Sequence, residues 1–309
     1  MSSYYDNKDG FLHPQVKQYN SHMVMTNVHK ETKTKYWNID TRFRDDYDQY
    51  YQTLTGGIVP WYTFTLPQPI HDVKTISVDN VEVPISFFNI SEALGNHVLQ
   101  VNSDLIVVPD RFYSSDIELR TALNTVLAAS NLTFDISYNG NPYCSFTNTS
   151  GSAIVLDFAI QPTAMGGEFD KFHVKSKLGW LLGFRNISYT VAPYSTLRSE
   201  GLLDLTGPRY LYLILDEFTS SNTNSFISPL PTSIINKNIL AKISMDYYHY
   251  PFGQVLAANP TNGFLTTDVR SFNGKVNLQK LKIQLVNEYG NPVHLNGLDF
   301  SFCLEINYE

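Results

Sequence analysis

Hydrophobic and polar residues alternate along the C-terminal segment from Leu281 to Glu309, on both sides of a loop rich in Gly, Asn and Pro. In the second run, one face carries Phe300, Phe302, Leu304 and Ile306, and the other carries Ser301, Cys303, Glu305 and Asn307. A period of two is typical of a strand with one face on a hydrophobic core. The pattern therefore predicts that the chain ends in two strands and that the last one is a core strand.

The same criterion predicts strands over most of the chain. Further strands are expected over residues 37–41, 62–66, 73–83, 132–138, 143–147, 153–160, 210–215 and 239–247, with a hairpin over 96–108. Pro67 and Pro69 are expected to end the strand that precedes them, because proline has no N–H for a strand ladder. Residues 193–208 and 257–268 are expected to be a linker and a loop.

Helical periodicity is confined to the middle of the chain. Between Ser115 and Ala129, apolar residues recur at helical spacing, and Ser115 with Glu118 fits a capping box. Residues 178–185, with the sequence LGWLLGFR, predict a short helical turn that ends at Gly183. The block that mixes hairpins with helix therefore differs from the sheet segments on either side.

These patterns divide the chain into three parts. Residues 35–84 and 191–309 are expected to form one antiparallel β-sandwich, and residues 85–190 an α+β subdomain inserted into it. Residues 1–34 are polar and aperiodic. They are either a disordered tail or an extended N-terminal arm that orders on neighbouring subunits.

Composition narrows the function. The net charge is −7, and charged residues make up only 17% of a chain that contains 20 tyrosines and 19 phenylalanines. Without clustered Lys and Arg, direct nucleic-acid binding is not expected.

No apolar run reaches membrane-spanning length, and the first residues do not form a secretory signal. Cys144 and Cys303 are expected to be free thiols.

No residue pattern identifies a catalytic, cofactor-binding or metal site. Asp45, Asp46 and Asp48 lie close together, but their spacing is not that of a calcium loop, and pairing with neighbouring arginines is the simpler use. His173, near Trp180, is better explained as a histidine at a domain edge than as a catalyst. The protein is therefore expected not to be an enzyme and to need no cofactor.

Four pieces of the sequence occur in an order that matches a known pattern. They are NIDTRFRDDY at 38–47, LPQPIHDVKTISVDNVEVP at 66–84, LGWLLGFR at 178–185, and VNLQKLKIQL with LNGLDFSFCLEI within 276–306. Together they resemble the minor capsid and vertex (penton-like) proteins of large eukaryotic DNA viruses and their satellite viruses. The resemblance covers the chain from about Trp37 to its end.

The resemblance implies a mainly β, jelly-roll β-sandwich without catalysis. It also implies a virion component that is assembled in the host cytoplasm and joins or cements capsomers. Its partners would be the major capsid protein and other minor capsid proteins, in a homo- or hetero-oligomer. The alternative from the residues themselves is a carbohydrate-binding β-sandwich module, with Trp37, Trp61 and Trp180 as candidate stacking residues.

Overall fold

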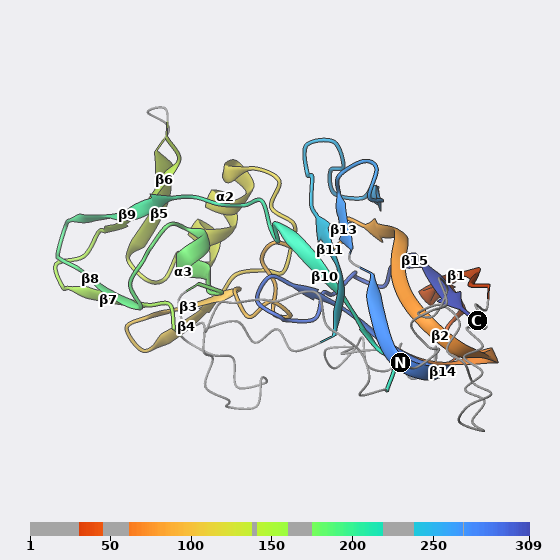
Figure 1. Ribbon diagram of the computed structural model, residues 1–309. Coiled ribbons are helices and arrows are strands. Elements are labelled where there is room, and N and C mark those ends of the chain that lie inside the picture. The colour runs from red at the N-terminus through yellow and green to blue at the C-terminus, as the bar shows by residue number, and fades with distance from the viewer. Residues whose placement is uncertain (1–30, 46–61, 138–140, 160–174, 219–237, 268) are drawn as a thin grey trace, which may run out of the picture.

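The computed structural model describes residues 31–45, 62–137, 141–159, 175–218, 238–267 and 269–309 (Figure 1). The larger part of the sheet structure comes from β1 (Lys33–Asp40), β2 (Tyr62–Pro84), β10 (Tyr210–Asp216), β11 (Ile239–Ser244), β12 (Val255–Ala258), β13 (Leu265–Thr267), β14 (Arg270–Asn287) and β15 (Ser301–Tyr308). The middle of the chain supplies β3 (Val98–Val101), β4 (Asp104–Val107), α2 (Asp116–Val126), β5 (Leu132–Ser137), β6 (Tyr143–Asn148), β7 (Ile154–Asp157), α3 (Leu178–Leu181), β8 (Ser188–Val191) and β9 (Thr196–Leu202).

The fold is mainly β, and every pairing between described strands is antiparallel. The large sheet has the order β1-β15-β2-β14-β10-β11-β13, and β12 pairs with the end of β2. This sheet curls until its far end approaches its middle, where the Val78 N–H of β2 donates to Thr267 Oγ1 of β13 at 3.3 Å. The result is a jelly-roll-like β-sandwich, as the sequence predicted.

The inner face of the curled sheet encloses one hydrophobic core. The C-terminal strand contributes Phe302, Leu304 and Ile306, all fully buried, and Phe302 lies opposite Val81 of β2. The faces predicted for this strand are therefore confirmed. Ile39 of β1 pairs with Phe302 from the other side, so the last strand lies between two neighbours.

The prediction that Pro67 and Pro69 end a strand is wrong. β2 runs through both prolines as one bent strand. Lys280 of β14 pairs with Thr65, whereas Leu278 pairs with Ile70, so the intervening β2 residues bulge out of the ladder. Proline is tolerated at a bulge because no ladder hydrogen bond is required there.

A second hydrophobic core lies in the middle of the chain, between Ile90 and Val191. Around it are a sheet of order β4-β3-β7-β8, a sheet of order β5-β6-β9, and the predicted helix α2. Ser115 caps this helix by accepting a hydrogen bond from the Glu118 N–H at 3.3 Å. Figure 1 shows these elements gathered at the opposite end of the molecule from β1 and β15.

Two segments that were expected to be irregular contain strands. Residues 193–208 hold β9, which pairs with β6, and residues 257–268 hold β13 and the end of β12. The signal in β9 is weak because small residues, Ser199 and Gly201, occupy two of its three inward positions, and Leu197 is the one large apolar residue on that face. β12 and β13 are four and three residues long, which is too short to show a period.

The division into a sandwich, an inserted subdomain and an arm remains a prediction. Residues 1–30 of the predicted arm lie outside the described residues. The strand predicted at 37–41 begins earlier, at Lys33, so the last two residues of the predicted arm belong to β1 and pair with Tyr308 and Asn307.

A buried ion pair closes one corner of the sandwich. Arg270, at the start of β14, donates to Glu217 Oε2 at 2.6 Å, and these side chains are 2% and 0% exposed. The same guanidinium donates to the carbonyl oxygens of Leu215 at 2.9 Å and Ile239 at 3.3 Å. Arg270 therefore ties the end of β10 and the start of β11 to β14.

Candidate functional site

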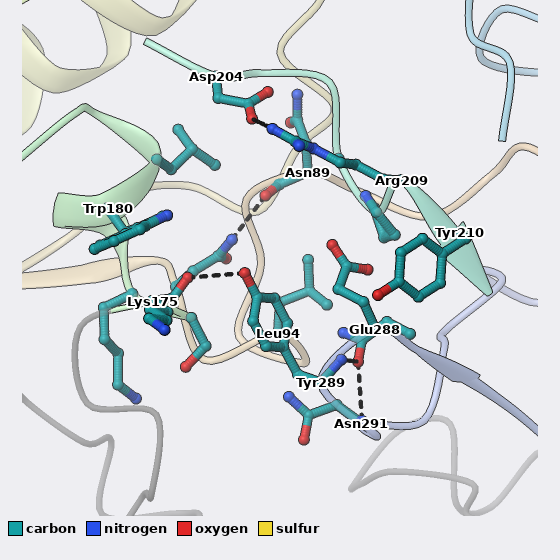
Figure 2. A pocket seen from close by; sticks show the side chains of 17 residues that line it. Asn89, Leu94, Lys175, Trp180, Asp204, Arg209, Tyr210, Glu288, Tyr289 and Asn291 are labelled. Carbon is teal, nitrogen blue, oxygen red and sulfur yellow. Dashed lines mark hydrogen bonds and ion pairs between the residues drawn. The ribbon is translucent and has the colours of Figure 1, made fainter. Parts of the chain in front are cut away.

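A cleft of about 490 Å³ lies between the two hydrophobic cores. One wall comes from the start of β10 and the turn after β14. The other wall comes from the segments around residues 89–96, 175–181 and 204–209 (Figure 2). The two walls are joined where the Tyr289 hydroxyl donates to the Lys175 carbonyl oxygen at 3.2 Å. The cleft is thus built from segments that are far apart in the sequence.

The side chain of Asn287, the last residue of β14, holds the turn that follows this strand. Asn287 Oδ1 accepts hydrogen bonds from the backbone N–H groups of Tyr289 at 3.0 Å and Asn291 at 2.9 Å. Gly290 has a φ of +85°, a backbone state that glycine adopts without strain. This geometry places Glu288 and Tyr289 at the cleft, and Figure 2 shows the Glu288 carboxylate turned into the space between Tyr210 and Tyr289.

Several polar side chains of the cleft are already used to hold the fold. Asn89 bonds the backbone of Tyr113 through both ends of its amide and donates to the Leu205 carbonyl oxygen at 2.8 Å. Asn96 accepts from the Ser91 N–H and donates to the Asn89 carbonyl oxygen. These two amides shape the cleft wall and have little capacity left for a ligand.

Glu288, unlike these two asparagines, keeps a polar atom that the described part of the fold does not use. Its Oε2 atom is buried and has no hydrogen-bond partner within the part of the chain that the structure describes. Burial raises the pKa of this carboxyl, and the backbone N–H groups of Glu288 and Arg209 act in the opposite direction. A buried acceptor without a partner is costly, because the desolvation of the group is not repaid.

The charges around Glu288 are mixed. Arg209 pairs with Asp204 at 3.3 Å, and Lys177 Nζ lies 3.4 Å from the Gly95 carbonyl oxygen. Burial opposes ionisation of Asp204, but hydrogen bonds from Thr206 and Arg209 outweigh it and hold the pKa of Asp204 below its usual value. The cleft thus combines three cationic side chains, counting Lys175, with two carboxyl groups.

Trp180 lies on the opposite wall, and its local sequence is explained by packing. The Arg185 guanidinium lies over its ring at 4.2 Å and donates to its carbonyl oxygen at 2.9 Å. Gly179 is required because a Cβ there would come within 2.5 Å of the Phe158 ring, and Gly183, at φ +89°, lies against the Gly201 carbonyl. The LGWLLGFR segment therefore fixes the Trp180 ring at the cleft wall.

The candidate residues from the sequence are dispersed. Of the three tryptophans, Trp180 lines the cleft, Trp37 packs against the sandwich core, and Trp61 lies outside the described residues. Asp45 is exposed, and the Tyr62 hydroxyl is 3.5 Å from its Oδ1, whereas Asp46, Asp48 and His173 lie outside the described residues. Arg42 pairs with Asp40 at 2.6 Å.

The sequence analysis did not identify the cleft. Glu288, Tyr289, Arg209 and Lys175 were not recognised, because nothing in the sequence brings these positions together. The turn-forming residues Gly290 and Asn291 were the available signal, since a tight turn next to a buried strand presents its side chains in a fixed direction.

The described residues show no grouping of three or more His, Cys, Asp or Glu side chains that could hold a metal ion. Across the same ranges, no helix has both the length and the apolar character needed to cross a membrane.

No protein-family model matches this chain, and no curated protein matches it at a significant level. Among solved structures, the chain is similar to the mavirus penton protein, known from a crystal structure of its selenomethionine-labelled form. The TM-score is 0.42 and the sequence identity 10%, over 89% of this chain and 99% of the penton protein chain.

Proposed function

We propose that this protein is a structural component of a virion, a minor capsid or vertex protein that joins or cements capsomers of the major capsid protein. The observation that carries the proposal is a well-packed β-sandwich with large aromatic side chains left in solvent. Exposed examples are Tyr36, Phe43, Tyr194, Phe218, Tyr248 and Phe252. Aromatic residues are enriched where protein surfaces meet, and a shell protein requires such surfaces on several sides.

The β1 edge is the surface best suited to a neighbouring subunit. β1 is the terminal strand of the large sheet among the described strands, so one side of its backbone has no ladder partner there. Tyr36 is 61% exposed in this strand, and Phe43 is 81% exposed just beyond it. An open strand edge beside exposed aromatic rings suits strand addition by another chain.

Particle fractionation tests the proposal. Particles purified on a density gradient from a culture that produces the protein are probed with an antibody against the recombinant chain. The protein should sediment with the major capsid protein and remain with it after a high-salt wash. Recovery only in the soluble fraction would overturn the proposal.

Substitutions at the edge test the contact surface. Tyr36→Ser with Phe43→Ser should lower incorporation into particles severalfold while leaving thermal unfolding unchanged, because both side chains are in solvent. The matched control is Tyr248→Ser, which removes a side chain that is 87% exposed between β11 and β12. Equal loss in the control would contradict the assignment to β1.

A truncation addresses the predicted N-terminal arm. Removing residues 1–32 stops short of β1, so the melting temperature should stay nearly constant, while incorporation should fall if the arm binds neighbouring subunits. A truncated protein that unfolds would place the arm inside the domain. One that assembles as well as the full chain would make it an idle tail.

A further inference from the structure

We propose that the cleft between the two cores is a binding site for a neutral saccharide, one or two sugar units in size, with Glu288 and Asn291 as its main hydrogen-bonding residues. This inference goes beyond the proposed capsid role and does not depend on it. It rests on the free polar groups of the cleft, its charge balance, its aromatic walls and its volume.

The free polar groups are suited to hydroxyls. Within the described residues, Glu288 Oε2 is buried without a hydrogen-bond partner, and Asn291 bonds Asn287 through its backbone N–H rather than its side-chain amide. A carboxylate oxygen accepts from a hydroxyl, and an amide both donates and accepts. A sugar offers neighbouring hydroxyls that donate and accept at once, so its chemistry matches both groups.

The charge balance disfavours charged ligands. A phosphate or sulfate would be placed against Glu288, whose acceptor oxygen would repel it. A lysine or arginine side chain from a peptide would meet Lys175, Lys177 and Arg209 on the surrounding walls. A neutral ligand with many hydroxyls avoids both conflicts, which is why we favour a saccharide over a peptide.

The walls supply flat apolar surfaces. Tyr210 and Tyr289 flank Glu288, and Trp180 lies across the cleft (Figure 2). Aromatic rings with a polar edge combine apolar contact with hydrogen bonding, as the C–H faces and hydroxyls of a sugar require. The volume, about 490 Å³, is in the range of small-molecule sites.

The rings are held in place before any ligand binds. Arg185 covers Trp180 from one side, and the Tyr289 hydroxyl is anchored on the Lys175 carbonyl. Burial and the acidic neighbour Glu288 raise the pKa of Tyr289 to about 12, so this phenol stays protonated and continues to donate. A preorganised wall lowers the ordering cost of binding.

Saturation-transfer NMR on the full chain tests the site. The probes are the methyl glycosides of glucose, galactose, mannose and N-acetylglucosamine, together with lactose, cellobiose and chitobiose, at millimolar concentration. We expect transfer to at least one of them. Glu288→Ala should weaken that binding tenfold or more and Asn291→Ala severalfold, because a hydrogen bond to a charged group contributes more than one to a neutral amide. The control Glu92→Ala, on the exposed side of the neighbouring loop, should leave the affinity unchanged.

Stability provides a second readout. Within the described residues Glu288 Oε2 is buried without a partner, whereas the carboxyl also accepts from the backbone N–H of Arg209. Glu288→Ala relieves the first and removes the second, so it should change the melting temperature little while it weakens sugar binding tenfold or more. That combination separates a ligand-binding group from a structural one. The proposal is overturned if no sugar probe binds or if sugar binding survives both cleft substitutions. It is also overturned if lysine capped as its N-acetyl amide, with a free side-chain amine, binds the cleft and the sugars do not.

Discussion

The buried pair Arg270–Glu217 allows a quantitative test of the sandwich core. Glu217→Met leaves the guanidinium buried without its carboxylate, and Arg270→Met leaves the carboxylate without its guanidinium. Removing one partner of a buried ion pair costs about 3–5 kcal/mol, because an uncompensated charge remains in the interior. We therefore expect each single variant to lose about 4 kcal/mol of unfolding free energy.

The double variant should be more stable than the sum of the single variants implies. Arg270→Met with Glu217→Met leaves no buried charge, and methionine fills much of the same volume. What remains lost is the donation to the carbonyl oxygens of Leu215 and Ile239, which costs about 1–3 kcal/mol for each group left unsatisfied. Additive effects would give a loss of about 8 kcal/mol. We expect a smaller loss, with a coupling energy of about 2 kcal/mol or more.

A double-mutant cycle in urea measures this coupling. Unfolding is followed by a probe in the sandwich, such as exchange of β14 amides, because two cores need not unfold in one transition. The control cycle uses Arg120 and Asp135, which pair at 3.2 Å on the surface with 45% and 63% exposure, and should give at most about 1 kcal/mol. Additivity within about 0.5 kcal/mol at Arg270 and Glu217 would refute the argument.

Three further predictions concern the cores and the thiols. Phe302→Asp should prevent soluble folding because it buries an unpaired charge, whereas Cys303→Asp, on the other face of β15, should remain soluble. A soluble Phe302→Asp protein with unchanged melting, beside an insoluble Cys303→Asp protein, would mean that the faces are reversed. Burial raises the pKa of Cys144 to about 12, so a thiol reagent at pH 8 should label Cys144 only after unfolding and Cys303 before it; rapid labelling of native Cys144 would contradict its burial. Hydrogen exchange should give Asp116–Val126 and residues 281–285 different opening free energies, and one shared value would indicate a single cooperative core.

Local sequence patterns predicted an element correctly where the spacing of its own apolar residues shows which face is buried. The last strand, the helix with its Ser115 cap and the turn at Gly183 follow from alternation, helical spacing and turn chemistry. Prolines misled the prediction in β2, because the effect of Pro67 depends on the register of β14, which is distant in sequence. β9 was missed because two of its three inward positions carry small residues, Ser199 and Gly201.

The cleft could not be predicted for a related reason. Glu288 is an ordinary polar residue in a turn, and its significance comes from one carboxyl oxygen that is buried without a partner among the described residues. That property exists only after the turn has been placed against Arg209 and the wall from the second core. Likewise, the link between Arg270 and Glu217 crosses 53 residues of sequence, and no local pattern marks either residue as buried.

The pairing of β2 also determines the order in which the chain acquires its structure during synthesis. β2 is made early, but its two longest partners, β14 and β15, are the last strands to be made, and the bonded residues Glu82 and Ser301 are 219 positions apart. The hairpins and helix between them pair mainly with near neighbours and can form while translation continues. The apolar face of β2 stays open until β14 and β15 have been made. A nascent chain arrested before β14 should therefore bind a chaperone through β2 even when its middle segment has already folded.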